Sequence, residues 1–255
     1  MNNKILDAYK LYNGTVELLF DPVKHVYTVD GRTVVGATGV TGIIAKPALM
    51  YWAVNMAIGY LEGALKAGQV YDEIAIKRML ETAKSAHRIK KEEAGDIGTL
   101  VHEAIEEYIK TGNVREVVHA QAKVAFDNFM KWVKDEKVKF TDSERKVYSK
   151  KKDYAGTMDF TCTIGKKFYV GDTKTASGIY DEFFFQTSGY QQAYTEETKK
   201  KVDGQVIVRV GKDGSFEVAK RTNKDYKKNV VAFNGALDLY KRVQELKDLS
   251  KREAQ

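Results

Sequence analysis

Two β-favouring runs, residues 155–164 and 167–175, constrain the fold of this chain more than any other feature. Gly165 lies between them, and a two-residue type II′ turn takes glycine at its first central position. A hairpin closed by this turn pairs Asp159 directly with Asp172, since both positions are equally far from the turn. Cross-strand partners have Cβ atoms about 5 Å apart. The pattern therefore predicts two carboxylates at one place on a β-sheet.

The two acids need a positive charge between them. Opposed carboxylates repel each other, and apolar surroundings strengthen the repulsion. Hard carboxylate oxygens suit Mg²⁺ or Mn²⁺, and such a cation neutralises both acids. Lys174 shares a face with Asp172 because side chains alternate along a strand, so its ammonium can hold or activate a water molecule or stabilise charge on a phosphate. The alternative is a hairpin ion cluster without a metal, in which facing acids are an expensive way to form a salt bridge.

Two helical segments flank this hairpin in the sequence. After it, Gln186 and Tyr190 fall at i and i+4 of a helical pattern, on one face. Before it, residues 96–112 predict a helix whose end is marked by Gly112. His102 stands beside the apolar face of that helix. A single histidine at such a position is usually a structural residue, so the pattern alone favours packing.

Four short motifs, taken in order, resemble the RecB-type branch of the PD-(D/E)xK nuclease superfamily. They are G-T-x-x-H from Gly98 to His102, G-x-x-D from Gly156 to Asp159, D-x-K from Asp172 to Lys174, and Q-x-x-x-Y from Gln186 to Tyr190. Each motif is weak alone, and their order on helix, strand, strand and helix makes the match specific. Within this branch the chain looks most like phage exonucleases and the mitochondrial single-strand DNA exonuclease. The resemblance covers about Gly98 to Tyr194.

This resemblance implies an α/β fold with a restriction-endonuclease-like core, in which helices flank a central mixed β-sheet. An N-terminal hairpin and a helical cap or arch precede that core. The implied activity is that of a metal-dependent DNA exonuclease, which hydrolyses phosphodiester bonds in phage recombination, replication or DNA processing and favours single-stranded ends. DNA is the implied partner, together with a phage single-strand annealing or replication protein.

The same resemblance assigns roles to individual residues. One or two Mg²⁺ or Mn²⁺ ions would be held by four ligands, which are His102, Asp159, Asp172 and the Thr173 backbone carbonyl. Lys174 would orient or deprotonate the attacking water, while Gln186 and Tyr190 would position the scissile strand or hold Lys174. Glu144 resembles an acid found one strand ahead of the G-x-x-D motif, and Glu106, four residues after His102, could reach the surroundings of the metal.

Three other functions stay open. The chain could be a catalytically silent nucleic-acid-binding protein on a nuclease fold, although His102, both acids and Lys174 are all present. It could be a structure-specific endonuclease that cuts flaps. It could also be an interaction protein, such as a phage factor directed at a host nuclease or defence system, which would not need an intact metal site.

Composition adds weaker constraints. The chain has 255 residues, a net charge of +7 and a single cysteine, Cys162. A basic protein suits a polyanionic partner, although many soluble proteins are mildly basic. One cysteine excludes an internal disulfide and a four-cysteine iron–sulphur cluster. The sequence has no apolar run of membrane-spanning length and no signal peptide, so we expect a cytoplasmic location, in a bacterial host cell if the protein is phage-encoded.

Several further elements follow from the hydrophobic pattern. We expect a hairpin within residues 15–35, helices at about 48–67, 71–92, 119–137 and 226–246, and a hairpin at 205–219. Residues 1–95 form the N-terminal hairpin and cap in this scheme, and residues 96–255 form the core. Cations and aromatic side chains that could grip DNA are Tyr51, Trp52, Arg88, Lys90, Lys91, Lys150 and Lys151. For each of them, packing or a solvated surface explains the residue equally well.

Overall fold

The computed structural model describes residues 6–253, which form two compact units. One unit combines the chain up to Ile44 with the chain from Val101 onward, and the other comprises Ala45–Leu100. This grouping differs from the predicted division at residue 95, because the N-terminal hairpin packs with the second half of the chain.

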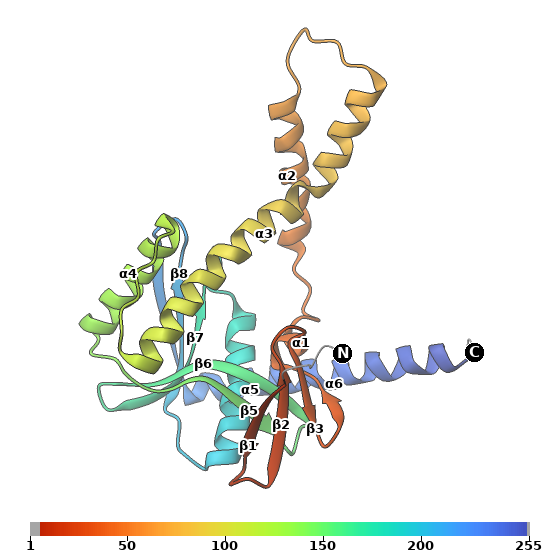
Figure 1. The fold of residues 1–255 in the computed structure, drawn as a ribbon. Coiled ribbons are helices and arrows are strands. Elements are labelled where there is room, and N and C mark those ends of the chain that lie inside the picture. Colours follow the sequence, from red (N-terminus) through yellow and green to blue (C-terminus); the bar gives the residue numbers. More distant parts are fainter. Residues whose placement is uncertain (1–5, 254–255) are drawn as a thin grey trace. The chain divides into compact units, whose positions relative to one another are not determined.

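The first unit begins with a small antiparallel sheet (Figure 1). Its strands, in order, are β1 (Asp7–Leu11), β2 (Val16–Asp21), β3 (Val26–Val29) and β4 (Arg32–Val34). The hairpin predicted within residues 15–35 is confirmed by β3 and β4, whose two-residue turn has positive φ values of 50° at Asp30 and 73° at Gly31. One face of this sheet packs on Tyr148 and Ala155 of the larger sheet.

The larger sheet has five strands in sequence order. They are β5 (Lys139–Ser149), β6 (Tyr154–Ile164), β7 (Lys167–Lys174), β8 (Gly204–Val210) and β9 (Phe216–Thr222). Only β7 and β8 are parallel, and the other neighbours are antiparallel. The fold is therefore α/β with a mixed sheet, and the predicted hairpin at 205–219 is confirmed as β8 and β9.

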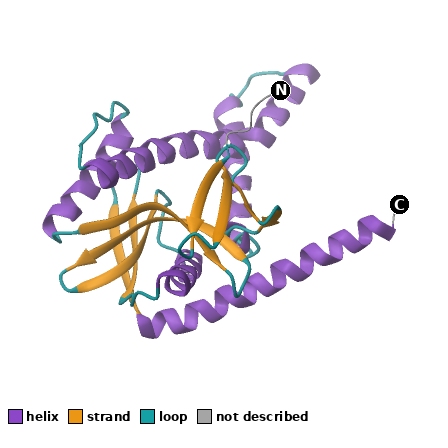
Figure 2. Ribbon diagram, turned by 60° about the horizontal axis from the view of Figure 1, so that its bottom comes forward, coloured by secondary structure: helices purple, strands orange, loops and turns teal. Residues whose placement is uncertain are grey.

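Helices flank this sheet (Figure 2). The crossover from β7 to β8 is α5 (Asp181–Thr198), and α6 (Asn223–Glu253) packs on α5. The helix α4 (Ala120–Asp135) packs against β8 and β9. Its apolar face, which the spacing of its residues predicted, is buried. A short helix, α1 (Ala37–Thr41), contacts α5 and α6 and was not predicted.

The second unit holds α2 (Pro47–Ala64) and most of α3 (Glu73–Thr111). The prediction of separate helices at 71–92 and 96–112 was wrong, because α3 is continuous. An internal glycine costs a helix only about 1 kcal/mol, and Gly95 and Gly98 therefore interrupt nothing. Gly112 does end the helix, with φ of 74°, as predicted. In residues 6–253, no helix is both long and apolar enough to cross a membrane.

Candidate active site

The β6–β7 hairpin has the predicted register. Ile164 pairs with Lys167, and Gly165 has a φ of 61° in the turn. The ladder then ends at the pair Phe160–Gly171, one position before the two acids. Beyond that point β7 continues beside β8 as far as Lys174, whereas β6 continues beside β5. The prediction that Asp159 and Asp172 form a regular cross-strand pair was therefore wrong, because β6 and β7 separate at this point.

Asp159 fills the gap between the strands with its side chain. Its Oδ2 accepts a hydrogen bond of 2.7 Å from the Thr173 N–H, which takes the place of a backbone partner. The same oxygen lies 3.6 Å from Nδ1 of His102. His102 belongs to the C-terminal part of α3, within the same compact unit as the sheet. The histidine named by the motif and the first acid therefore meet in space.

The alternation of side chains along β6 reverses at Asp159. Tyr154 and Met158 pack in the core formed with α5 and α6, whereas Phe160 meets the Trp132 ring of α4 with centroids 6.5 Å apart. In β5 the residue facing this point is Glu144, since its neighbours pair with the neighbours of Asp159. Glu144 has a φ of 49°, in the left-handed region that non-glycine residues rarely occupy. Both strands are thus distorted at the acids.

Asp172 and Lys174 form a buried ion pair. The carboxylate of Asp172 is 2% exposed, and its Oδ2 lies 2.5 Å from Nζ of Lys174. Burial raises the pKa of Asp172 to about 7, with Lys174 opposing and Asp159 adding to the rise. Burial lowers the pKa of Lys174, but the two acids outweigh burial and the net direction is upward. The charge of Asp159 raises the pKa of both Asp172 and Lys174, because the three side chains lie close together.

The Thr173 carbonyl faces the same gap as its N–H. In an extended strand, the N–H and C=O of one residue leave the backbone on the same edge. The N–H of Thr173 points to Asp159, so the carbonyl oxygen also lies on the β6 side. This orientation agrees with its predicted role as a ligand.

Gln186 and Tyr190 support the site from α5. The Gln186 Nε2 donates to the Tyr190 hydroxyl at 2.7 Å and to Oγ1 of Thr38 in α1 at 2.8 Å. The Tyr190 ring lies against Gly156, where an added Cβ would come within 2.6 Å of it. Burial raises the pKa of Tyr190, and Asp172 and Asp159 raise it further. The glycine of the G-x-x-D motif and the tyrosine of the Q-x-x-x-Y motif are therefore packing partners.

Glu144 is close enough to Asp159 to respond to its charge. Burial raises the pKa of Glu144 to about 7, and repulsion from Asp159 is the next cause. Lys146 lies beside it, with Nζ 4.0 Å from Oε2 of Glu144 and 4.7 Å from the Phe20 ring centre. Glu106 forms an ion pair with Lys110. Its negative charge also contributes to the raised pKa of Glu144. Lys146 had no sequence signal, because its neighbours come from distant segments.

The donor atoms fit a hard divalent cation with few protein ligands. In residues 6–253 no group of three or more His, Cys, Asp or Glu side chains is arranged to hold a metal ion. Mg²⁺, however, keeps several waters and is usually bound through one or two carboxylates. Asp159 and Asp172, with the Thr173 carbonyl, supply such a set. A cation there would also oppose the two effects that raise the pKa of Asp172, which are burial first and repulsion from Asp159 second.

The predicted DNA contacts divide between the two units. In Ala45–Leu100, Tyr51 is exposed, the Trp52 ring meets His87 at 6.5 Å between centroids, and Lys91 is exposed. Arg88 and Lys90 of that unit form exposed ion pairs with Glu92 and Glu93. In the first unit, Lys150 lies 4.4 Å above the Tyr12 ring and Lys151 is exposed. Their contact with DNA stays a prediction.

No known protein family matches this chain, and no curated protein matches its sequence. The geometry of the site is therefore the basis for its proposed chemistry.

Proposed function

We propose that this protein is a metal-dependent deoxyribonuclease with a restriction-endonuclease-like core. The observation that carries the proposal is the convergence of Asp159, Asp172 and Lys174 where β6 and β7 separate, with His102 beside Asp159. A buried acid beside a second, partly exposed acid and one lysine is a costly arrangement for stability alone. It is an appropriate one for binding a cation and a phosphate at the same place.

Asp159, Asp172 and the Thr173 carbonyl would hold Mg²⁺ or Mn²⁺, with His102 as a further ligand on the Asp159 side. Such an ion lowers the pKa of a bound water and stabilises the charge that develops on the phosphate. Burial of Asp172 keeps bulk water away from its carboxylate, and electrostatic attraction is stronger in such surroundings. The Thr173 N–H holds one oxygen of Asp159 and fixes its orientation.

Lys174 would act through its charge. Its Nζ is held by Asp172, and an ammonium group has three N–H donors and no acceptor. One donor goes to Asp172, and the others can hold the attacking water or a phosphate oxygen. The acids keep Lys174 protonated, which favours orienting the water over deprotonating it. Gln186, Tyr190 and Thr38 would keep α5 and α1 in place beside β6.

The decisive experiment measures cleavage of end-labelled linear and circular DNA, single- and double-stranded, in Mg²⁺, Mn²⁺ or EDTA. Asp172→Asn and Lys174→Met should each lower the rate by roughly 10²–10⁴-fold. The matched controls are Asp203→Asn and Lys201→Met, because these residues form a more exposed Lys–Asp pair, 3.3 Å apart, before β8. The controls should retain activity.

The outcomes separate the candidate functions. Cleavage of linear DNA with circular DNA left intact supports an exonuclease, the activity that the resemblance implies. Cleavage of circular DNA identifies an endonuclease. DNA binding without cleavage in either metal supports the catalytically silent protein. Absence of both binding and cleavage overturns the proposal and leaves the interaction protein.

A further inference from the structure

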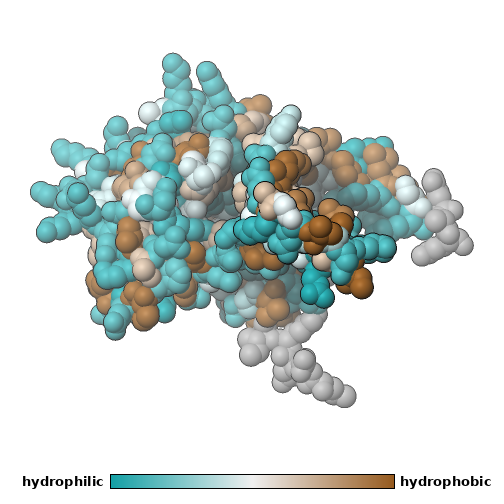
Figure 3. Space-filling model, turned by 90° about the horizontal axis from the view of Figure 1, so that it is seen from above, coloured by the Kyte–Doolittle hydropathy of each residue, from teal (hydrophilic) through white to brown (hydrophobic). Residues whose placement is uncertain are grey.

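The second compact unit leaves an apolar helix uncovered. Among the residues of α2, Glu62 alone is charged, and none is buried. Met50, Val54 and Ile58 follow each other at four-residue intervals and are 71%, 56% and 48% exposed. Figure 3 shows brown, hydrophobic side chains gathered over this helical pair. The spacing makes them one ridge along the helix.

A groove lies beside this ridge, between α2 and the first part of α3. It has a volume of about 350 Å³. Its apolar lining comes from Ala57 and Leu61 of α2 and from Leu80 and Ala83 of α3, and its charged rim is formed by Lys77, Glu81 and Lys84. A ridge of aliphatic side chains from another helix is the complementary shape for such a groove.

The helical pair buries too little to be complete by itself. In Ala45–Leu100 only Ala83 and Gly98 are buried. Most helical stability in proteins comes from packing of an apolar face, and an isolated helix of this length is marginal in water. Exposed Leu49 and Tyr51 add to the apolar surface of the ridge, and such a surface marks an interaction site.

The charges of this unit favour a second copy of the chain over nucleic acid. Residues 45–100 contain eight Lys or Arg residues and seven Asp or Glu residues, so the unit is nearly neutral and the basic excess of the protein lies elsewhere. The rim of the groove carries both signs, with Glu81 between Lys77 and Lys84 along α3. In a two-fold dimer the same surface of both copies forms the contact, in opposite directions. A rim that carries both signs can therefore pair a lysine of one copy with a glutamate of the other.

We propose that two copies of this chain associate through α2, with the ridge of Met50, Val54 and Ile58 from each copy seated in the α2–α3 groove of the other. This inference does not rest on the proposed nuclease activity. It concerns a surface outside the compact unit that contains the acids.

The test is the mass of the full-length protein in solution, measured by light scattering and sedimentation. The wild type should have twice the chain mass of 28.8 kDa. Val54→Glu should raise the dissociation constant at least about a hundredfold, because it buries an unpaired carboxylate. The matched control is Val231→Glu, since Val231 is 68% exposed on α6, and this variant should remain a dimer.

A monomeric or trimeric wild type overturns the proposal. A Val54→Glu protein that remains a dimer, or a Val231→Glu protein that dissociates, also overturns it. Cross-linking decides the matter if Val54→Glu fails to fold, as judged by circular dichroism. Treatment of the Val54→Cys and Ile58→Cys variants with a bis-maleimide cross-linker should give covalent dimers at micromolar protein, whereas Val231→Cys should not. The native Cys162 is buried and does not interfere.

Discussion

At the scale of single residues, two glycines shape the candidate site by giving room to aromatic rings. Gly156 receives the Tyr190 ring, and Gly171 receives the Phe160 ring where the β6–β7 ladder ends. Both glycines lie in strands, where glycine is normally unfavourable and often marks a close approach. Their presence explains how bulky rings can lie next to Asp159 and the buried Asp172.

We expect Gly171→Ala to destabilise the protein by about 1–3 kcal/mol, because the new Cβ would overlap the Phe160 ring. Urea unfolding measures this loss. Gly235→Ala is the matched control, since Gly235 lies in α6 with open space around the position of its Cβ. That change should be neutral or slightly stabilising. Equal stability of the two variants would contradict the close approach at Gly171.

Cys162 should be unreactive in the folded protein. Its side chain is buried in β6, and burial raises the pKa of the thiol to about 12. The thiolate is the reactive form, so both access and ionisation oppose reaction at neutral pH. A colorimetric thiol reagent should therefore react only as fast as the protein unfolds, and at once in 6 M guanidinium. Rapid reaction of the folded protein would show that β6 is open to solvent.

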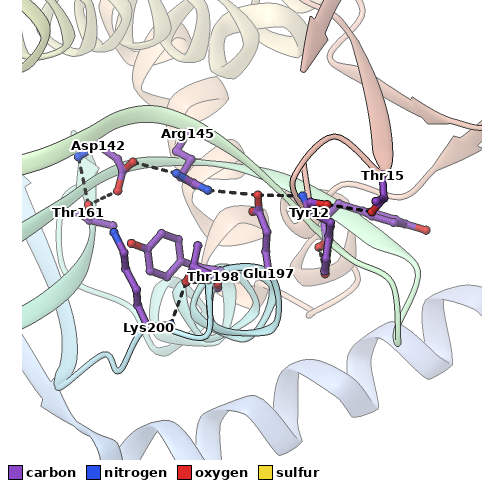
Figure 4. Close-up of polar contacts among 10 residues, drawn as sticks. Tyr12, Thr15, Asp142, Arg145, Thr161, Glu197, Thr198 and Lys200 are labelled. Carbon is purple, nitrogen blue, oxygen red and sulfur yellow. Dashed lines mark hydrogen bonds and ion pairs between the residues drawn. The ribbon is translucent and has the colours of Figure 1, made fainter. Parts of the chain in front are cut away.

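At the scale of elements, a polar network joins α5 to β5 and to the N-terminal sheet (Figure 4). Arg145 of β5 contacts Asp142 at 3.1 Å and Glu197 at 3.3 Å. Glu197, near the end of α5, also accepts a hydrogen bond from the Tyr12 N–H at 3.3 Å. Arg145 further lies 5.2 Å from the centre of the Tyr194 ring. The network therefore ties three segments that are distant in sequence.

Replacing Arg145 by methionine should cost about 1–3 kcal/mol in unfolding free energy, because the 9% exposed carboxylate of Glu197 is left without its cationic partner. The double variant Arg145→Met, Glu197→Met should recover part of that loss. Arg242→Met is the control, since Arg242 forms an exposed pair with Glu245 on α6 and such pairs contribute at most about 1 kcal/mol. Similar losses in both single variants would contradict the special role of Arg145.

At the scale of the whole molecule, stability is unevenly distributed between the two units. The first unit contains two hydrophobic clusters and the five-stranded sheet. In the second unit, α2 has no buried residue. Segments with few buried contacts open locally at low free-energy cost, whereas core strands open only in global unfolding.

Hydrogen exchange should show this difference. In the Val54→Glu variant, which we expect to be monomeric, amides of α2 should exchange orders of magnitude faster than those of β6 and β7. Mass spectrometry of peptic fragments gives both rates from one sample. In the wild type, α2 should become slower as protein concentration rises, since association would cover it. Protection of α2 equal to that of β6 in the variant would contradict its exposure.

Local features of the sequence determined much of the first unit. The glycine turn at Gly165 sets the β6–β7 register, because a two-residue turn leaves no freedom in pairing. The apolar spacing of residues 119–137 and 226–246 predicted α4 and α6, and Gly112 marked the end of α3. These signals depend on neighbours in the chain, so they can be recognised without the fold.

Tertiary structure alone decided how the acids are held. The separation of β6 from β7, the left-handed backbone of Glu144 and the reversal of faces at Asp159 depend on which partner each strand follows. Thr38 and Lys146 reach the site from segments that carry no motif. The continuity of α3 and the exposure of α2 likewise follow from packing. The periodicity of a sequence indicates which face of a helix is apolar, but it does not indicate which other element packs on that face.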